Sequence, residues 1–136
     1  MIRTRLNFLF AFAILVLSGC GSNDPVPVTE LSEIVGSWKG AGQVIAMKIL
    51  PDGSFLQALT LSEIEEGEYE ELDFVFEDGQ IIVVGLESYC GEEDGVYQAQ
   101  LLSSGNLEFI VVDDDCTHRI GHLLAESVEN EWARVE

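Results

Sequence analysis

Positive charge is scarce in this sequence. The 136 residues include 6 lysines and arginines against 25 aspartates and glutamates, which gives a formal net charge of −19 at pH 7. Proteins bind nucleic-acid phosphates by displacing counterions with lysine and arginine, so this composition excludes a nucleic-acid partner. Acidic runs at 63–73, 92–94 and 113–115 are typical of solvated surface, and none has the spacing of a calcium-binding loop.

The sequence also lacks an apolar run long enough to cross a membrane as a helix, which needs about 20 residues. Its longest apolar stretch, Leu6–Leu17, follows two arginines and ends in Leu-Ser-Gly-Cys at positions 17–20. This arrangement resembles the leader of a bacterial lipoprotein. The resemblance implies that residues 1–19 are a signal peptide and that Cys20 becomes the lipidated first residue of the mature chain.

The lipoprotein resemblance also implies a location. Lipoproteins retained in the inner membrane commonly carry aspartate after the cysteine, whereas Gly21 stands here. We therefore expect a cell-envelope protein on the periplasmic face of the outer membrane, with acyl chains such as palmitate on Cys20 as its membrane anchor. Pro25 and Pro27 favour an extended tether over residues 20–30. Residues 31–136 then have the length of one small domain.

Few segments look helical, and short strand-like runs separated by turn residues fill most of the chain. Leu72, Phe74 and Phe76 alternate with Asp73 and Val75, which is the period-two pattern of a half-buried strand. Strand-like runs lie at 43–50, 54–61, 69–76, 81–86, 95–102, 107–112 and 131–135. This spacing predicts an all-β protein, a small antiparallel barrel of about eight strands. We expect one or two short helices, near residues 31–34 and 115–124.

Two sets of residues resemble known families. A short helical turn followed by Gly36 and Trp38 resembles the G-x-W signature of lipocalins, in which an arginine covers the tryptophan at the closed base of the barrel. Arg134 or Arg119 would supply that arginine. The C-terminal half resembles the small bacterial lipocalin-like proteins of the calycin group through Cys90-Gly91, Gly95-Val96-Tyr97, Asp113–Cys116, Arg119 and Trp132-Ala133-Arg134. These resemblances imply a lipocalin-like barrel domain over residues 31–136.

Only two cysteines remain once Cys20 is lipidated. Outside the cytoplasm such a pair, Cys90 and Cys116, most simply forms a disulfide. The residues leave one alternative open, because His118 and His122 lie four apart, on one face of a helix. With the two cysteines they would form a tetrahedral zinc set.

Catalytic motifs are absent from the sequence. It contains no G-x-S-x-G, P-loop or H-E-x-x-H pattern, and the stretch Gly40-Ala41-Gly42 lacks the remaining glycine of a dinucleotide-binding loop. Neither histidine has a serine partner that would indicate nucleophilic catalysis. We therefore expect no enzyme activity and no cofactor.

The expected function is that of a binding module. A lipocalin-like barrel would hold a small apolar ligand in its lumen, because such sites are concave and mostly apolar. The alternative is an envelope scaffold that binds a protein partner through its surface and carries no ligand. In a narrow barrel the lumen side chains can simply form the core, so internal packing distinguishes the two functions. The candidate lumen residues are Ile45, Met47, Ile49, Phe74, Phe76, Tyr97, Leu101 and Phe109.

Overall fold

The computed structural model describes residues 22–42, 44–84, 87–124 and 130–135, so the predicted signal peptide and Cys20 lie outside the described residues. No helix of the described part is long and apolar enough to cross a membrane. The elements, in chain order, are β1 (Val26–Pro27), η1 (Leu31–Glu33), β2 (Gly36–Gly40), β3 (Ala46–Ile49), β4 (Ser54–Ala58), α1 (Leu61–Glu66), β5 (Glu70–Glu77), β6 (Gln80–Val84), α2 (Glu87–Cys90), β7 (Gly95–Leu101), β8 (Leu107–Asp113), α3 (Thr117–Leu123) and β9 (Trp132–Val135).

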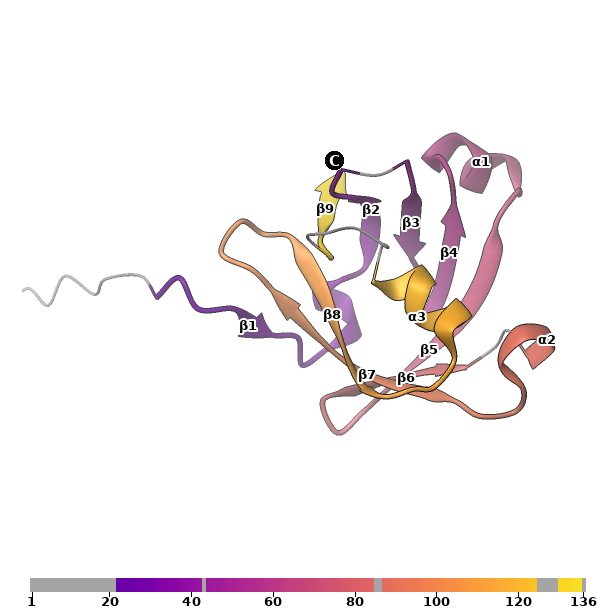
Figure 1. The fold of residues 1–136 in the computed structure, drawn as a ribbon. Coiled ribbons are helices and arrows are strands. Elements are labelled where there is room, and N and C mark those ends of the chain that lie inside the picture. The colour runs from indigo at the N-terminus through magenta and orange to yellow at the C-terminus, as the bar shows by residue number, and fades with distance from the viewer. Residues whose placement is uncertain (1–21, 43, 85–86, 125–129, 136) are drawn as a thin grey trace, which may run out of the picture.

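Strands β2 to β9 form a closed antiparallel barrel (Figure 1). Each strand pairs with the next along the chain, and β9 pairs with β2 to complete the ring. Ser37 of β2 lies opposite Val135 of β9, whereas β8 and β9 meet at a single pair, Leu107 and Trp132. Because every barrel strand has a neighbour on each side, closure protects the strand edges from pairing with other chains. The predicted all-β barrel of about eight strands is confirmed.

The extra strand, β1, adds to the barrel at β7, where Val26 lies opposite Leu101. Val28 follows it into the core, and its backbone N–H donates to the carbonyl of Ala99 at 2.8 Å. The second part of the segment predicted as an extended tether, residues 20–30, is therefore attached to the barrel. From Val26 onward it is extended because it pairs with the sheet.

Side-chain alternation fills the barrel interior. In β5, Leu72 and Phe74 are buried whereas Asp73 and Val75 are exposed, as the sequence pattern predicts. The largest fully buried side chains are Trp38, Trp132, Arg119, Tyr97, Phe55 and Phe109. The hydrophobic core thus lies inside the ring of strands.

Both helical segments predicted from the sequence are present, as η1 and α3, and two further short helices, α1 and α2, accompany them. Helix α1 begins where the sequence pattern predicts a strand that continues to Leu61. Thr60 and Glu63 form a capping box: the Glu63 N–H donates to Thr60 Oγ1 at 3.2 Å, and the Thr60 N–H donates to Glu63 Oε2 at 3.0 Å. Such reciprocal capping starts a helix, so β4 ends at Ala58.

Helix α3 packs against the barrel with one of its faces. Arg119 and Leu123, four residues apart, are buried, and the backbone carbonyl of Leu123 accepts a hydrogen bond from Trp132 Nε1 at 2.8 Å. His118 and His122 precede these two residues by one position each, so they share the adjoining face. The packing of α3 therefore fixes where its two histidines lie.

Candidate functional site

The candidate lumen residues form the core of the barrel. Five of them, Met47, Ile49, Phe74, Tyr97 and Phe109, are buried, and the other three, Ile45, Phe76 and Leu101, are half-buried against the same cluster. The Phe74 ring stacks on Phe55 with centroids 5.0 Å apart and meets the edge of Phe109 at 5.9 Å. Side chains in contact in this way occupy the lumen themselves.

The tryptophan of the G-x-W signature lies under an arginine, and that arginine is Arg134. Its Cζ atom lies 4.2 Å from the centroid of the Trp38 ring. The guanidinium also donates to the carbonyls of Val35 at 3.1 Å and Glu33 at 2.9 Å. Gly36 has a φ of +142°, and a Cβ there would lie 2.9 Å from Arg134 Nη1. The positive φ favours glycine at this position, and a side chain there would push the guanidinium aside.

The other candidate, Arg119, has a different role. It is buried, and its Nε and Nη2 atoms donate to the two carboxylate oxygens of Asp114 at 2.6 and 2.7 Å, while Nη1 donates to the carbonyl of Glu93 at 2.9 Å. The Tyr97 hydroxyl donates to the same carboxylate. A Cβ at Gly95 would collide with Asp114, Arg119 and Tyr97, so this small residue leaves the space in which they meet.

The titration of this cluster follows from its geometry. Burial alone would raise the pKa of Asp114, but hydrogen bonds from Arg119 and Tyr97 outweigh it and hold the pKa below the usual carboxyl value. Hydrogen bonding to Asp114 raises the pKa of Arg119. Burial, followed by the hydrogen bond to Asp114, raises the pKa of Tyr97 above its usual range. Asp114 and Arg119 therefore form a buried ion pair that holds the β7–β8 end of the barrel against α3.

Cys90 and Cys116 form a disulfide, with Cα atoms 5.4 Å apart. The bond joins α2 to Cys116, the N-cap residue of α3. The alternative zinc set of Cys90, Cys116, His118 and His122 is therefore wrong for its two cysteines, because sulfur atoms joined in a disulfide are not thiolate ligands. The two histidines nevertheless do converge, and a different residue meets them.

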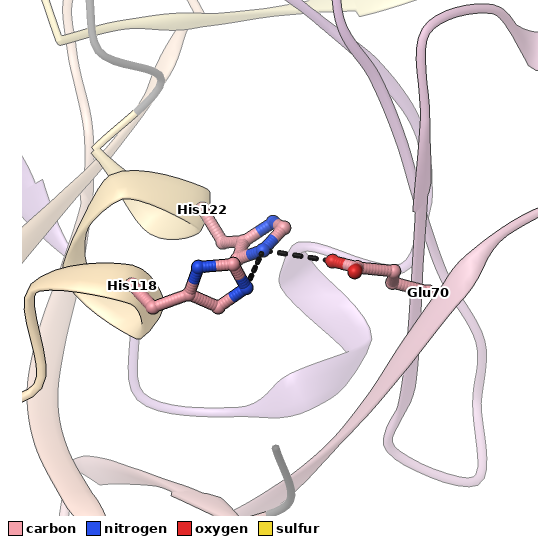
Figure 2. Close-up of side chains that lie close together, drawn as sticks. All are labelled: Glu70, His118 and His122. Carbon is pink, nitrogen blue, oxygen red and sulfur yellow. Dashed lines mark hydrogen bonds and ion pairs between the residues drawn. The ribbon is translucent and has the colours of Figure 1, made fainter. Parts of the chain in front are cut away.

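That residue is Glu70, at the start of β5 (Figure 2). The Nε2 atoms of His118 and His122 lie 3.1 Å apart, and His122 Nε2 lies 2.8 Å from Glu70 Oε2. One potential ligand atom from each of the three residues lies within 4.8 Å of the others. Figure 2 shows both rings on α3 directed toward the carboxylate on the neighbouring strand. We call this group the histidine–glutamate cluster.

The strands place Glu70 by their alternation. It continues the inward-facing row of Leu72 and Phe74 to the rim of the barrel, where it is half-exposed and meets His122 of α3. Gln57 is its cross-strand partner on β4. Gln57 is 4% exposed, and its Nε2 donates to the backbone carbonyl of His122 at 2.9 Å while its Oε1 faces His122 Nδ1. The rim thus presents two polar side chains to the helix above it.

An acidic cleft adjoins the cluster. Its volume is about 620 Å³, and His118 and Tyr89 lie in its wall together with acidic residues, namely Glu93, Asp94, Asp113, Asp114 and Asp115. The Tyr89 ring stacks on the His118 ring with centroids 4.3 Å apart. Within the described residues, Arg119 is the basic side chain of this cleft wall, and its charge is matched by Asp114. The surroundings of His118 are therefore strongly negative.

Comparisons of the chain with protein-family models, with curated proteins and with solved structures find no match. Sequence reasoning identified the two histidines but not Glu70 or Gln57. The alternation of β5 was the available signal for Glu70, because it puts residues 70, 72 and 74 on one face.

Proposed function

We propose that this chain is a lipid-anchored protein of the cell envelope that acts through the outer surface of a lipocalin-like barrel. The anchor is Cys20, and the location is the periplasmic face of the outer membrane. The observation that carries the proposal is the packed lumen: Phe55, Phe74 and Phe109 are in ring contact inside the barrel. A surface-acting module is favoured over a carrier of apolar ligands because the lumen candidates are already in contact with each other.

The disulfide supports the proposed location. Cys90 and Cys116 are joined, and disulfides persist in oxidising compartments such as the periplasm but are rare in the cytosol. The leader resemblance points to the same side of the inner membrane, because a signal peptide directs export. Two separate parts of the chain, residues 1–20 and the Cys90–Cys116 pair, thus support the proposed extracytoplasmic location.

The anchor is tested by expressing the full chain in a Gram-negative host with an alkyne-bearing palmitate analogue. We expect the wild type to take up the label and to fractionate with outer membranes, and Cys20→Ala to do neither. Ser22→Ala, two residues further on, is the matched control and should behave as the wild type. Equal labelling and equal fractionation of Cys20→Ala would overturn the anchor.

The packed lumen is tested by native mass spectrometry of the detergent-solubilised chain. We expect the mass of the lipidated polypeptide without an additional lipid-sized component. A retained apolar ligand that is lost in a Phe109→Trp variant would instead establish carriage in the lumen.

A further inference from the structure

We infer that the histidine–glutamate cluster, Glu70, His118 and His122, is a binding site for a divalent transition metal of the zinc class. Two imidazoles and one carboxylate form the His₂Glu set that zinc takes when it keeps a fourth position open. The inference is independent of the lipid anchor, because it uses only residues of the barrel and of α3.

Two of the three donor-atom separations are close to those that such an ion requires, and the third is within 4.8 Å. Bonds of about 2.0–2.1 Å in a tetrahedral site place neighbouring ligand atoms about 3.3 Å apart. Here the two Nε2 atoms are separated by 3.1 Å, and Nε2 of His122 lies 2.8 Å from Glu70 Oε2. Binding of the ion would lengthen these two distances by a few tenths of an ångström, through side-chain rotation at the rim. The Glu70 side chain is 47% exposed, so it has room to make that adjustment.

The hydrogen bonds of Gln57 set the tautomer of His122. Its Nε2 donates to the His122 carbonyl, which can only accept, and this contact fixes which end of the amide faces the ring. The amide oxygen of Gln57 therefore faces His122 Nδ1, so Nδ1 carries the proton and donates. In the neutral ring Nε2 then holds a lone pair, and this is the atom directed at Glu70 and His118 (Figure 2).

Three electron-pair donors consequently point at one another. A shared cation satisfies all three donors together. Metal-bound histidines typically donate their other ring N–H to a carbonyl or carboxylate, which is the role of Gln57 here.

The second ring is also held in place. Tyr89 stacks on His118 with an interplanar angle of 16°. The adjacent residue, Cys90, is tied by the disulfide to Cys116 at the start of α3. Both imidazoles thus have supporting contacts, and such pre-organisation lowers the cost of gathering ligands around an ion.

The surrounding charge favours cations over anions. Glu93, Asp94 and Asp115 lie with His118 in the wall of the acidic cleft, and the chain as a whole carries a formal charge of −19. A negatively lined cleft raises the local concentration of cations and their rate of association. Imidazole donors select zinc-class ions over calcium and magnesium, which prefer oxygen ligands.

The test is a zinc titration of the full chain, purified in detergent and stripped with a chelator, by calorimetry. We expect one zinc ion per chain with a dissociation constant of about 1 µM or lower. Glu70→Gln and His118→Gln should each weaken binding by at least about tenfold. A tenfold excess of calcium over zinc should leave the wild-type binding curve unchanged.

Glu71→Gln is the matched control. It removes the same charge one residue further along β5, from an exposed side chain that points to the opposite face of the strand. It should bind zinc within about twofold of the wild type. An equal loss in Glu71→Gln and Glu70→Gln would show that only diffuse surface charge attracts the ion and would overturn the site.

A spectroscopic measurement keeps the inference falsifiable if a variant folds poorly. Cobalt(II) bound by the wild type should show the intense visible absorption of four- or five-coordinate geometry, and zinc should displace it. Weak absorption typical of hexa-aqua cobalt, or a wild type that binds neither metal, would overturn the site and leave a proton as the ion shared by the cluster.

Discussion

The barrel interior and the rim beneath α3 satisfy their polar groups in different ways. Inside, the indole N–H groups of Trp38 and Trp132 each donate to a backbone carbonyl, at 2.9 and 2.8 Å, and buried Arg119 is matched by Asp114. At the rim, two imidazole nitrogens and a carboxylate oxygen converge beside an acidic cleft, and the carboxylate is half-exposed. The polar groups of the interior are thus paired within the fold, whereas those of the rim form the site that we propose for a metal ion.

The largest loss of stability is expected from a substitution that leaves a cavity in the barrel interior. Phe109→Ala should lower the free energy of unfolding by about 3–5 kcal/mol, because it leaves a cavity in a packed aromatic cluster. Urea denaturation followed by tryptophan fluorescence measures this loss. A loss below about 1 kcal/mol would mean that the lumen already contains space. That result would favour a barrel that carries an apolar ligand in its lumen.

Removal of the disulfide should have the next largest effect. Cys90 and Cys116 are 26 residues apart, and closing such a loop contributes about 3.5 kcal/mol on the chain-entropy estimate. The Cys90→Ala/Cys116→Ala double variant should lose about that amount in urea denaturation. The wild type treated with a reducing agent is the control and should unfold at the same midpoint as the double variant.

Asp114→Asn should destabilise the fold by about 3 kcal/mol, because it leaves the buried guanidinium of Arg119 without its counter-charge. The variant also tests the pH dependence. The pKa of Asp114 is lowered in the folded state, so its contribution is complete above the ordinary carboxyl pKa and is lost as pH falls through the folded value.

The contribution of Asp114 can therefore also be measured from the midpoints of urea unfolding, recorded from pH 6 down to the pH at which the protein unfolds without urea. The wild type should lose stability below about pH 4 more steeply than Asp114→Asn, which has no carboxyl at this position to titrate. Parallel curves for the two proteins would show that other carboxyl groups dominate acid unfolding.

The smallest stability effect is expected at the rim. Glu70→Gln in metal-free buffer should unfold within about 0.5 kcal/mol of the wild type, because the side chain is half-exposed. Zinc at about 100 times its dissociation constant should stabilise the wild type by about 2.7 kcal/mol and the variant by much less. If zinc stabilises both proteins equally, the rim does not differ from the interior in the way proposed.

The strand pattern of the fold could be predicted, because alternation of polar and apolar residues is a local property. The inward row of β5 and the closing strand at Trp132 are examples. Helix α1 was missed although its capping box is visible in the sequence as Thr60 and Glu63, because the apolar residues around it also fit a strand. The boundary at β1 was missed because pairing with β7 depends on the tertiary fold.

The candidate site could be predicted only in part. His118 and His122 are four residues apart, so one helix turn brings them together without knowledge of the fold. Glu70 joins them only through closure of the barrel and the packing of α3, and the acidic run around it offers many equivalent carboxylates. Gln57 depends in addition on the register in which it lies opposite Glu70, which the sequence alone does not determine.

The pairing of β1 with β7 constrains how the molecule stands on a bilayer if Cys20 carries the acyl chains. From Cys20 to Val26 an extended chain reaches only about 20 Å. A lipid anchor at Cys20 would therefore keep the barrel close to the headgroups. Val26 pairs with Leu101, near the β7–β8 turn, whereas the disulfide and α3 lie toward the opposite end of β7 (Figure 1). With such an anchor, the β7–β8 hairpin tip would be the end tethered near the leaflet, and the histidines of α3 would lie toward the other end of the barrel.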